Sequence, residues 1–490
     1  MYIVTVAPEC APIAKVGGLA DVVYGLNKEL QLRGHTVEIF LPKYDCMRYD
    51  QIEDLHVAYE NLAVPWYASA INCTVWYGRL HGLNCFFLDP HSADNFFNRR
   101  SFYGFNDDSI RFAFFSKAAL EFMLKSNKRP EIIHCHDWQT GLVPVLLFEL
   151  YKYCGLERQR VCFTIHNFKY QGTAGAHVLT ALGLHHPEYY YHLDRLGETY
   201  NRSVLNFMKG GIVYSNFVTT VSPHYAWEAH NGDQGYGLGP TLNTHQGKYG
   251  GILNGIDYGM WNPEIDPLIP SHYTWKTLEN KTSNKNALRN RLLIRDGHKP
   301  IIASVGRLDP QKGVHLIRHA LFYALDRGAQ FVLLGSSPVA QINDEFWGLK
   351  HRFNNNPDCH LEIGYDEELA HLIYAGADMM IVPSLFEPCG LTQMISLRYG
   401  TVPVVRWTGG LADTVFDRDY APKPIHERNG YTFNDPTPAA FEVALDRAIG
   451  LWQYYPGEFY KLMVNGMRYD FSWHQSGTHY LNIYEFIRDK

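Results

Sequence analysis

Short apolar strands alternate with amphipathic helices along almost the whole of this 490-residue chain. Residues 2–7 (YIVTVA) have the pattern of a buried strand, residues 18–33 that of an amphipathic helix closed by Gly34, and residues 36–41 that of the next strand. A strand, a helix and a second strand in this order form the βαβ unit of a parallel sheet. The alternation therefore predicts an α/β fold in which helices cover parallel sheets.

The same alternation continues to the C-terminus and divides into two halves. Residues 226–250 lose the periodicity and fill with Gly, Asn and Gln, so we place the domain boundary just after them. This predicts two doubly wound, Rossmann-like domains, residues 1–255 and 256–472. The aromatic-rich pattern at 473–490 predicts a last helix that could dock on either half, and we place it on the N-terminal domain. Further strands are expected at 131–135, 161–165, 217–221, 300–305, 330–334, 379–382 and 402–405, and further helices near 109–125, 140 and 280–293.

Composition narrows the classes of partner. Lys and Arg number 44 and Asp and Glu 50, a net charge of −6, and no basic block stands out. Such a chain has no general field for nucleic acid or an anionic membrane, so an anion has to meet locally placed positive charge. No apolar stretch approaches the roughly 18 residues of a membrane span. The nine cysteines form no CxxC pair and the N-terminus shows no signal-peptide pattern, which favours a cytoplasmic protein.

Ligands of open α/β sheets bind beyond the carboxyl ends of the strands, so the loops at those ends matter most. The first such loop holds Lys15, Gly17 and Gly18 at the start of the helix 18–33. The glycines let the backbone approach a ligand, while the lysine and the free amides of a helix N-terminus favour an anion. The alternative is a plain glycine turn beside a solvent-exposed lysine, because the loop is neither a GxGxxG nor a Walker A motif.

Two loops of the second half carry charged residues in the same position. Arg307 and Lys312 are five residues apart, so a curved loop could direct both at one diphosphate; alternatively, they are ordinary surface cations. Glu387 precedes the amides of residues 390–392, which can hold a phosphate. A carboxylate beside an anion site is costly unless it serves chemistry, such as stabilising positive charge on a sugar ring. Its alternative is a helix N-cap carboxylate.

Two strands of the first half end in polar residues, at 134–137 (HCHD) and 166–167 (HN). Polar side chains at strand ends suit hydroxyl groups, so His166 and Asn167 are candidates to hold a sugar ring, and His134 is alternatively a buried core residue. We set a metal aside because no third ligand cluster has a recognisable spacing. The 33 tyrosines are either core and surface residues or stacking platforms for sugars or a base.

Several long motifs resemble, in order, those of the bacterial glycogen and plant starch synthases. The resemblance covers essentially the whole chain and implies a two-domain glycosyltransferase B fold whose domains face a cleft. It also implies transfer of glucose from a nucleotide sugar, ADP-glucose, to the non-reducing end of an α-1,4-glucan with retention of configuration. The matching strings are APECAPIAKVGGLADVV (7–23), CHDWQT (135–140), TIHNFKYQG (164–172), NGID (254–257), GRLDPQKG (306–313), FEPCGLTQ (386–393) and TGGLADTV (408–415).

The resemblance also implies roles for individual residues. The catalytic group it implies consists of Lys15, His166, Arg307, Lys312 and Glu387. The donor-binding group consists of Gly17, Gly18, Tyr365, Cys389, Gly390, Leu391 and Thr392, with Tyr365 stacked on the base. The sugar- and acceptor-binding group consists of Asp21, Tyr103, Asp137 and Asn167. No metal or further cofactor is expected, because the cations neutralise the leaving diphosphate.

The chain departs from the family pattern at two positions, and alternatives stay open. Val16 stands where many members have Thr, and Gln139 replaces the His of HDWH, so that Gln139 inherits no role of that His. The alternatives are a related transferase that uses UDP-glucose, such as sucrose synthase, a phosphorylase with a pyridoxal lysine, and a catalytically silent glucan-binding or priming protein. The family implies the cytoplasm or, in a plastid-bearing host, the plastid stroma.

Overall fold

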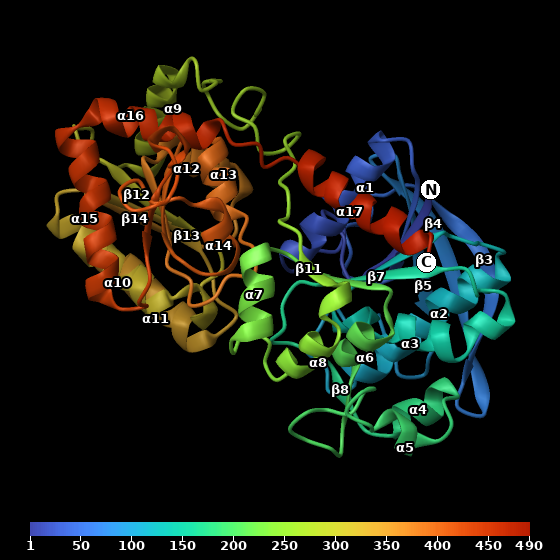
Figure 1. Cartoon of the computed structure of the whole chain (residues 1–490). Coiled ribbons are helices and arrows are strands. Elements are labelled where there is room, and N and C mark those ends of the chain that lie inside the picture. Colours follow the sequence, from blue (N-terminus) through green and yellow to red (C-terminus); the bar gives the residue numbers. More distant parts are fainter. The chain divides into compact units, whose positions relative to one another are not determined.

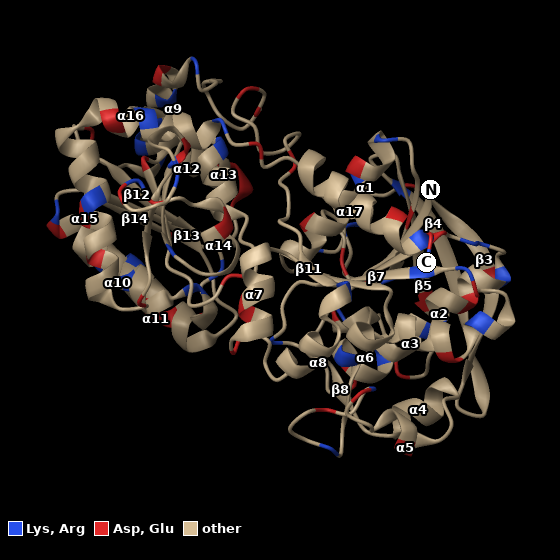
Figure 2. Ribbon diagram, in the orientation of Figure 1, with Lys and Arg blue, Asp and Glu red and all other residues tan.

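We describe a computed structural model of the whole chain, residues 1–490, which divides into two compact units (Figure 1). The first unit consists of Met1–Gly255 together with Trp473–Lys490, and the second consists of Ile256–Ser472. Both are built on parallel strands, so the predicted α/β class is confirmed. Lys and Arg are interspersed with Asp and Glu over both units (Figure 2).

The first unit is built on a nine-stranded sheet in the order β11-β10-β7-β6-β1-β2-β5-β4-β3. Its strands are β1 (Tyr2–Val6), β2 (Thr36–Pro42), β3 (Glu53–Trp66), β4 (Ser69–Leu80), β5 (Leu83–Pro90), β6 (Ile132–His136), β7 (Arg160–Ile165), β10 (Phe217–Thr220) and β11 (Tyr249–Gly251). All neighbours are parallel except the pairs of β4 with β5 and with β3. Strand order reverses between β1 and β6, and ligands of such sheets bind at this kind of switch point.

Helices cover both faces of this sheet, with α1 and α17 on one face and α2, α3 and α6 on the other (Figure 1). The helices are α1 (Gly18–Leu32), α2 (Asp108–Lys125), α3 (Leu142–Glu149), α4 (His177–Leu182), α5 (Pro187–Tyr190), α6 (Phe207–Tyr214), α7 (Pro223–Asn231), α8 (Gly239–Thr244) and α17 (Trp473–Arg488). A two-stranded ribbon, β8 (Thr173–Ala174) with β9 (Leu205–Asn206), accompanies them. No helix of the structure combines the length and the apolar character of a membrane span.

The last helix, α17, belongs to the first unit and packs on α1. Its Trp473, Tyr480 and Tyr484 are buried in one core cluster with Val22 and Leu26 of α1. The two helices approach closely at Gly25, where a Cβ atom would lie 2.0 Å from the indole nitrogen of Trp473. Burial of large aromatic side chains of this kind contributes about 1.5–3 kcal/mol each, so the contact fixes α17 on the first unit.

Two parts of the first unit differ from the sequence prediction. The hairpin of β3 and β4 was not expected, because the residues of β3 are largely exposed and its pairing shifts register three times, which breaks the alternation of a half-buried strand. The region 226–250, expected to be irregular, contains the end of α7, the helix α8 and β11. A Ser222 cap, whose hydroxyl accepts the Tyr225 amide, and Pro223 mark the start of α7.

The second unit is built on a six-stranded parallel sheet in the order β14-β13-β12-β15-β16-β17. Its strands are β12 (Ile301–Val305), β13 (Gln330–Gly335), β14 (Cys359–Ile363), β15 (Met379–Val382), β16 (Val402–Arg406) and β17 (Tyr431–Phe433). Its helices are α9 (Lys281–Leu292), α10 (Val314–Asp326), α11 (Ala340–Phe353), α12 (Glu367–Gly376), α13 (Thr392–Arg398), α14 (Gly409–Thr414), α15 (Pro438–Tyr454) and α16 (Pro456–Met467). The order reverses between β12 and β15, so the loops after these two strands flank the switch point.

Candidate active site

Lys312 and Glu387, predicted on separate loops, are in contact at the switch point of the second sheet. Lys312 Nζ donates to Glu387 Oε2 at 2.5 Å, and Ser384 Oγ donates to the same oxygen at 2.9 Å. The Glu387 side chain is only 6% exposed, so this pair is screened little by water. Helix α13 begins at Thr392, and Glu387 makes no capping bond to it. The N-cap alternative for Glu387 is therefore wrong.

The two loops are held together by their backbones. The Leu385 amide donates to the Gln311 carbonyl at 2.8 Å, and Gln311 Nε2 donates to the Phe386 carbonyl at 3.3 Å. Gly313, at φ 69°, ends the first loop so close to the second that a Cβ atom would lie 2.2 Å from the Pro383 carbonyl oxygen. The relative position of Lys312 and Glu387 is thus set by main-chain contacts and does not depend on the ion pair alone.

The segment Gly-Gly-Leu-Ala-Asp at 409–413, whose sequence also occurs at 17–21, packs against the Glu387 loop. The Gly410 amide donates to the Glu387 carbonyl at 3.0 Å. A Cβ atom at Gly410 would lie 2.1 Å from the carbonyl oxygen of Cys389, so no side chain fits there. The segment supports the loop that carries the predicted catalytic carboxylate.

Gly410→Ala tests this support. We expect turnover to fall about 10- to 100-fold and the protein to lose about 1–3 kcal/mol of stability, because the Glu387 loop has to move away from the new methyl group. Activity and thermal unfolding measure the two effects. Gly450→Ala in α15 is the matched control, since no atom lies within 4 Å of its Cβ position. Wild-type turnover in Gly410→Ala would show that the loop position does not matter.

The remaining predicted residues of the second unit lie on the loops after β12, β14 and β15 and at the start of α13. The Arg307 side chain is 55% exposed and lies 3.7 Å from Asp309, whereas Lys312 pairs with Glu387, so the two cations share no protein partner. The Tyr365 residue is 84% exposed on the loop after β14, and its stacking on a base stays a prediction. Cys389 is buried, Gly390 adopts φ 77°, Leu391 precedes α13 and Thr392 is its first residue.

In the first unit, a glutamate that sequence reasoning missed organises the predicted Lys15 loop. Glu9 Oε2 accepts the Val16 amide at 2.6 Å and the Gly17 amide at 3.1 Å, and Glu9 Oε1 accepts the Tyr103 hydroxyl at 2.7 Å. Burial raises the pKa of Glu9 despite these hydrogen bonds. The predicted acceptor residue Tyr103 thus shapes the anion loop through Glu9. Two sequence signals could have found Glu9: its place in the loop after β1 and its place inside the matching string at 7–23.

Lys15 forms an ion pair with another predicted residue, Asp21. Its Nζ lies 2.7 Å from Asp21 Oδ1, with the lysine side chain 45% exposed. Gly17 is the N-cap residue of α1, and Gly18 is its first residue. The loop therefore has the predicted geometry of a helix N-terminus with a cation beside it.

Asp137 and His166 meet at the carboxyl ends of β6 and β7. Asp137 Oδ1 accepts the His166 amide at 2.6 Å, and burial raises the pKa of Asp137 to about 7. Asp137 adopts φ 56°, a strained backbone for a residue other than glycine. The side-chain oxygen of Asn167 accepts a hydrogen bond from the Lys169 amide of the same loop at 3.0 Å. The His166 Nε2 atom lies 3.0 Å from Nδ1 of His136. No role was predicted for His136.

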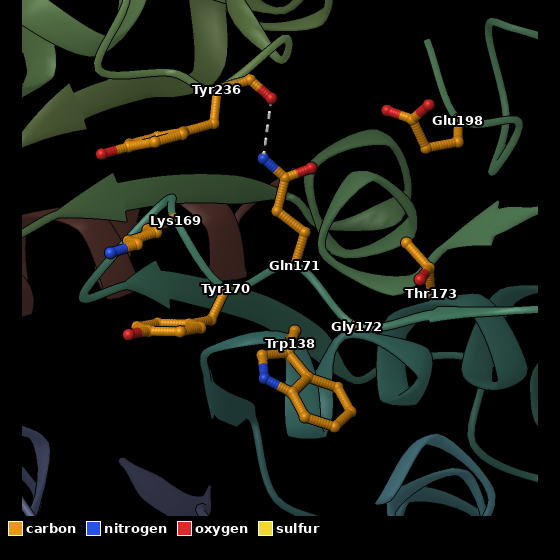
Figure 3. A pocket seen from close by; sticks show the side chains of 8 residues that line it. All are labelled: Trp138, Lys169, Tyr170, Gln171, Gly172, Thr173, Glu198 and Tyr236. Atoms are coloured by element: carbon orange, nitrogen blue, oxygen red, sulfur yellow. Dashed lines mark hydrogen bonds between the residues drawn. The ribbon is translucent and has the colours of Figure 1, made fainter. Parts of the chain in front are cut away.

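A cavity of about 500 Å³ opens beside these strand ends in the first unit. Figure 3 shows the rings of Tyr170 and Tyr236 extending to the same side, with Lys169 between them and Trp138 below. Gln171 Nε2 donates to the carbonyls of Phe168 and Tyr236 at 2.9 and 3.0 Å, which fixes the loop that carries Tyr170. The lining residues are Trp138, Lys169, Tyr170, Gln171, Gly172, Thr173, Glu198 and Tyr236. Aromatic faces beside polar groups suit a sugar.

Comparison with known proteins identifies the family. Residues 2–244 match the family described as "Starch synthase catalytic domain", and residues 285–455 match "Glycosyl transferases group 1". The chain is 64% identical to "Glycogen synthase 2" of Methylococcus capsulatus over 99% of this chain and 100% of that protein. It is 60% identical to "Probable glycogen synthase 2" of Synechocystis sp. over the full length of both. The chain belongs to the glycogen and starch synthase family.

A solved structure of this family matches the fold. The catalytic domain of starch synthase IV from Arabidopsis thaliana superposes with a TM-score of 0.96 and 46% identity, over 100% of this chain and 99% of that one. A sucrose-phosphate synthase of Thermosynechococcus elongatus, at 17% identity and a TM-score of 0.62, shares the fold alone. This glycogen synthase family member is therefore a glucosyltransferase with the GT-B fold, and the expected resemblance is confirmed.

Proposed function

We propose that this glucosyltransferase moves glucose from ADP-glucose to the non-reducing end of an α-1,4-glucan and retains the anomeric configuration. The observation that carries the proposal is the Lys312–Glu387 pair at the switch point of the second sheet. Full-length identity to proteins named glycogen synthases supports the glucan product. The solved starch synthase IV domain is bound to ADP and acarbose, which supports ADP-glucose as the donor and a glucan as the acceptor.

The proposed step breaks the bond between the anomeric carbon and the β-phosphate oxygen, and the electron pair leaves with ADP. The acceptor hydroxyl bonds to the same face of that carbon, and its proton passes to the leaving phosphate. Lys312 and Arg307 stabilise the charge on the diphosphate, and the buried Glu387 carboxylate stabilises the positive charge on the sugar ring. Because the protein's cations neutralise the leaving group, the proposal requires no metal and no further cofactor.

We propose that the acceptor glucan binds in the cavity of the first unit. Tyr170, 59% exposed in its wall, offers a face for a glucose ring. We expect Tyr170→Ala to raise KM for glycogen about 10-fold, because a stacking contact contributes about 1–2 kcal/mol, while ADP affinity stays unchanged. Tyr153→Ala is the control, because Tyr153 is also exposed but lies outside the cavity. Equal KM values for the two variants would remove Tyr170 from the acceptor site.

The donor experiment separates the remaining alternatives. The protein is incubated with glycogen and either ADP-glucose or UDP-glucose, and release of the nucleoside diphosphate is measured with and without a chelator. We expect fast release of ADP that the chelator does not change. Faster release of UDP would favour the UDP-glucose alternative, since a stacked ring at Tyr365 accepts any base. No release from either donor, with glycogen still bound, would favour a silent glucan-binding or priming protein.

A further inference from the structure

Three histidines and a tyrosine form a buried column behind the carboxyl ends of β6 and β7. His136 Nδ1 lies 3.0 Å from His166 Nε2, and the rings of His134 and His136 lie 4.1 Å apart between centroids. His134 Nε2 lies 2.7 Å from Thr164 Oγ1, and its Nδ1 lies 2.8 Å from the Tyr484 hydroxyl of α17. Both ring nitrogens of His134 therefore have partners, and the ring is a fixed support for His136.

The rings of this column are uncharged at neutral pH. Burial lowers the pKa of His134 and of His166 to about 3, and it lowers the pKa of His136 well below its usual value. A neutral imidazole carries one N–H and one bare nitrogen. Between His136 Nδ1 and His166 Nε2, one atom must therefore donate and the other accept.

The other ring nitrogen of His136, Nε2, shows which of the two atoms donates the hydrogen bond. His136 Nε2 is buried and has no hydrogen-bond partner. If it carried the proton, the protein would bury an orphaned N–H, which is rarer in folded proteins than an acceptor lone pair without a partner. The proton of His136 thus lies on Nδ1 and is donated to His166 Nε2.

This direction determines what His166 can do. Because its Nε2 accepts, its own proton lies on Nδ1, an atom that has no protein partner and that, unlike His136 Nε2, is not sealed inside the protein. We propose that His136 is a positioning residue that holds His166 in the Nδ1–H tautomer, so that His166 is a hydrogen-bond donor, and not a base, toward a hydroxyl of the glucosyl group. The donation from His166 to the glucosyl group rests on the proposed function, whereas the tautomer of His166 does not.

Two amide substitutions of His136 separate this role from a packing role. In His136→Asn the amide nitrogen can take the place of Nδ1 and keep the donated hydrogen bond, whereas in His136→Gln the amide lies near the place of Nε2 and that bond is lost. We expect kcat to stay within about 3-fold of the wild type in His136→Asn and to fall about 10- to 100-fold in His136→Gln. ADP affinity, measured by calorimetry, stays unchanged in both. Equal losses of kcat in the two variants would overturn the positioning role.

Nuclear magnetic resonance determines the tautomer of His166 without any measurement of activity. In wild-type protein labelled with nitrogen-15 in its histidine rings, the two nitrogens of His166 are assigned by their loss in His166→Asn. We expect the proton on Nδ1, and a proton on Nε2 would overturn the inference even if both His136 variants failed to fold. A protein that transfers no glucose but shows the Nδ1 proton would refute the proposed function and leave the tautomer standing.

Discussion

Lys312→Ala should lower kcat about 10³-fold with the fold intact, because a leaving diphosphate loses a cation that is fixed beside it. The structure adds a second reason. Lys312 Nζ is the charged partner of Glu387, whose side chain is only 6% exposed, so the variant also leaves a buried carboxylate without its countercharge. Initial rates of ADP release measure the loss, and circular dichroism checks the fold.

The control for Lys312→Ala is Lys350→Ala. Lys350 is 23% exposed, compared with 25% for Lys312, and pairs at 3.1 Å with Glu362, whose side chain is 36% exposed. Lys350→Ala therefore removes a similarly exposed lysine from an ion pair of the same unit without leaving a buried carboxylate. We expect Lys350→Ala to keep wild-type kinetics. Near-normal kinetics in a correctly folded Lys312→Ala variant would refute the assignment of Lys312 to the diphosphate.

Glu387→Gln should lower kcat about 10²- to 10³-fold and leave ADP affinity unchanged or slightly higher. The amide keeps the shape of the side chain but cannot stabilise positive charge on the sugar ring, and it removes a negative charge from beside the phosphates. Steady-state kinetics give kcat, and calorimetry gives the affinity for ADP.

A purely structural Glu387 would behave differently. Ser384 and Lys312 both donate to Glu387 Oε2, and a loss of these contacts that disturbed the loop would lower kcat and ADP affinity together. Glu362→Gln, which removes the carboxylate of the Lys350 pair, controls for loss of an ion pair. Trapping of a glucosyl group on Glu387 would contradict the same-face step.

Periodicity predicted the parallel sheets because β1, β12 and β15 are buried strands bounded by clear turns. It missed β3 because an exposed, bulged strand of a twisted hairpin has neither the alternation nor the apolar run on which the prediction depends. The family motifs then placed Lys312 and Glu387 in one site, and the structure brings them into contact.

Other parts of the site depend on tertiary contacts that no local pattern records. Glu9 acts on the Lys15 loop and on Tyr103, 94 residues away, and His136 acts on His166 of the neighbouring strand. The cavity wall combines Trp138 with Tyr236, which come from distant segments. Arg307 pairs with Asp309 of its own loop, and its convergence with Lys312 on a diphosphate stays a prediction.

The central claim is that Lys312 acts on the β-phosphate of the donor, and calorimetry with two nucleotides tests it most directly. ADP and AMP share a base, a sugar and an α-phosphate, so only a group that meets the β-phosphate distinguishes them. We predict that Lys312→Ala weakens ADP binding about 10-fold or more and changes AMP binding less than about 2-fold. Equal weakening for both nucleotides, or none for ADP, would contradict the account.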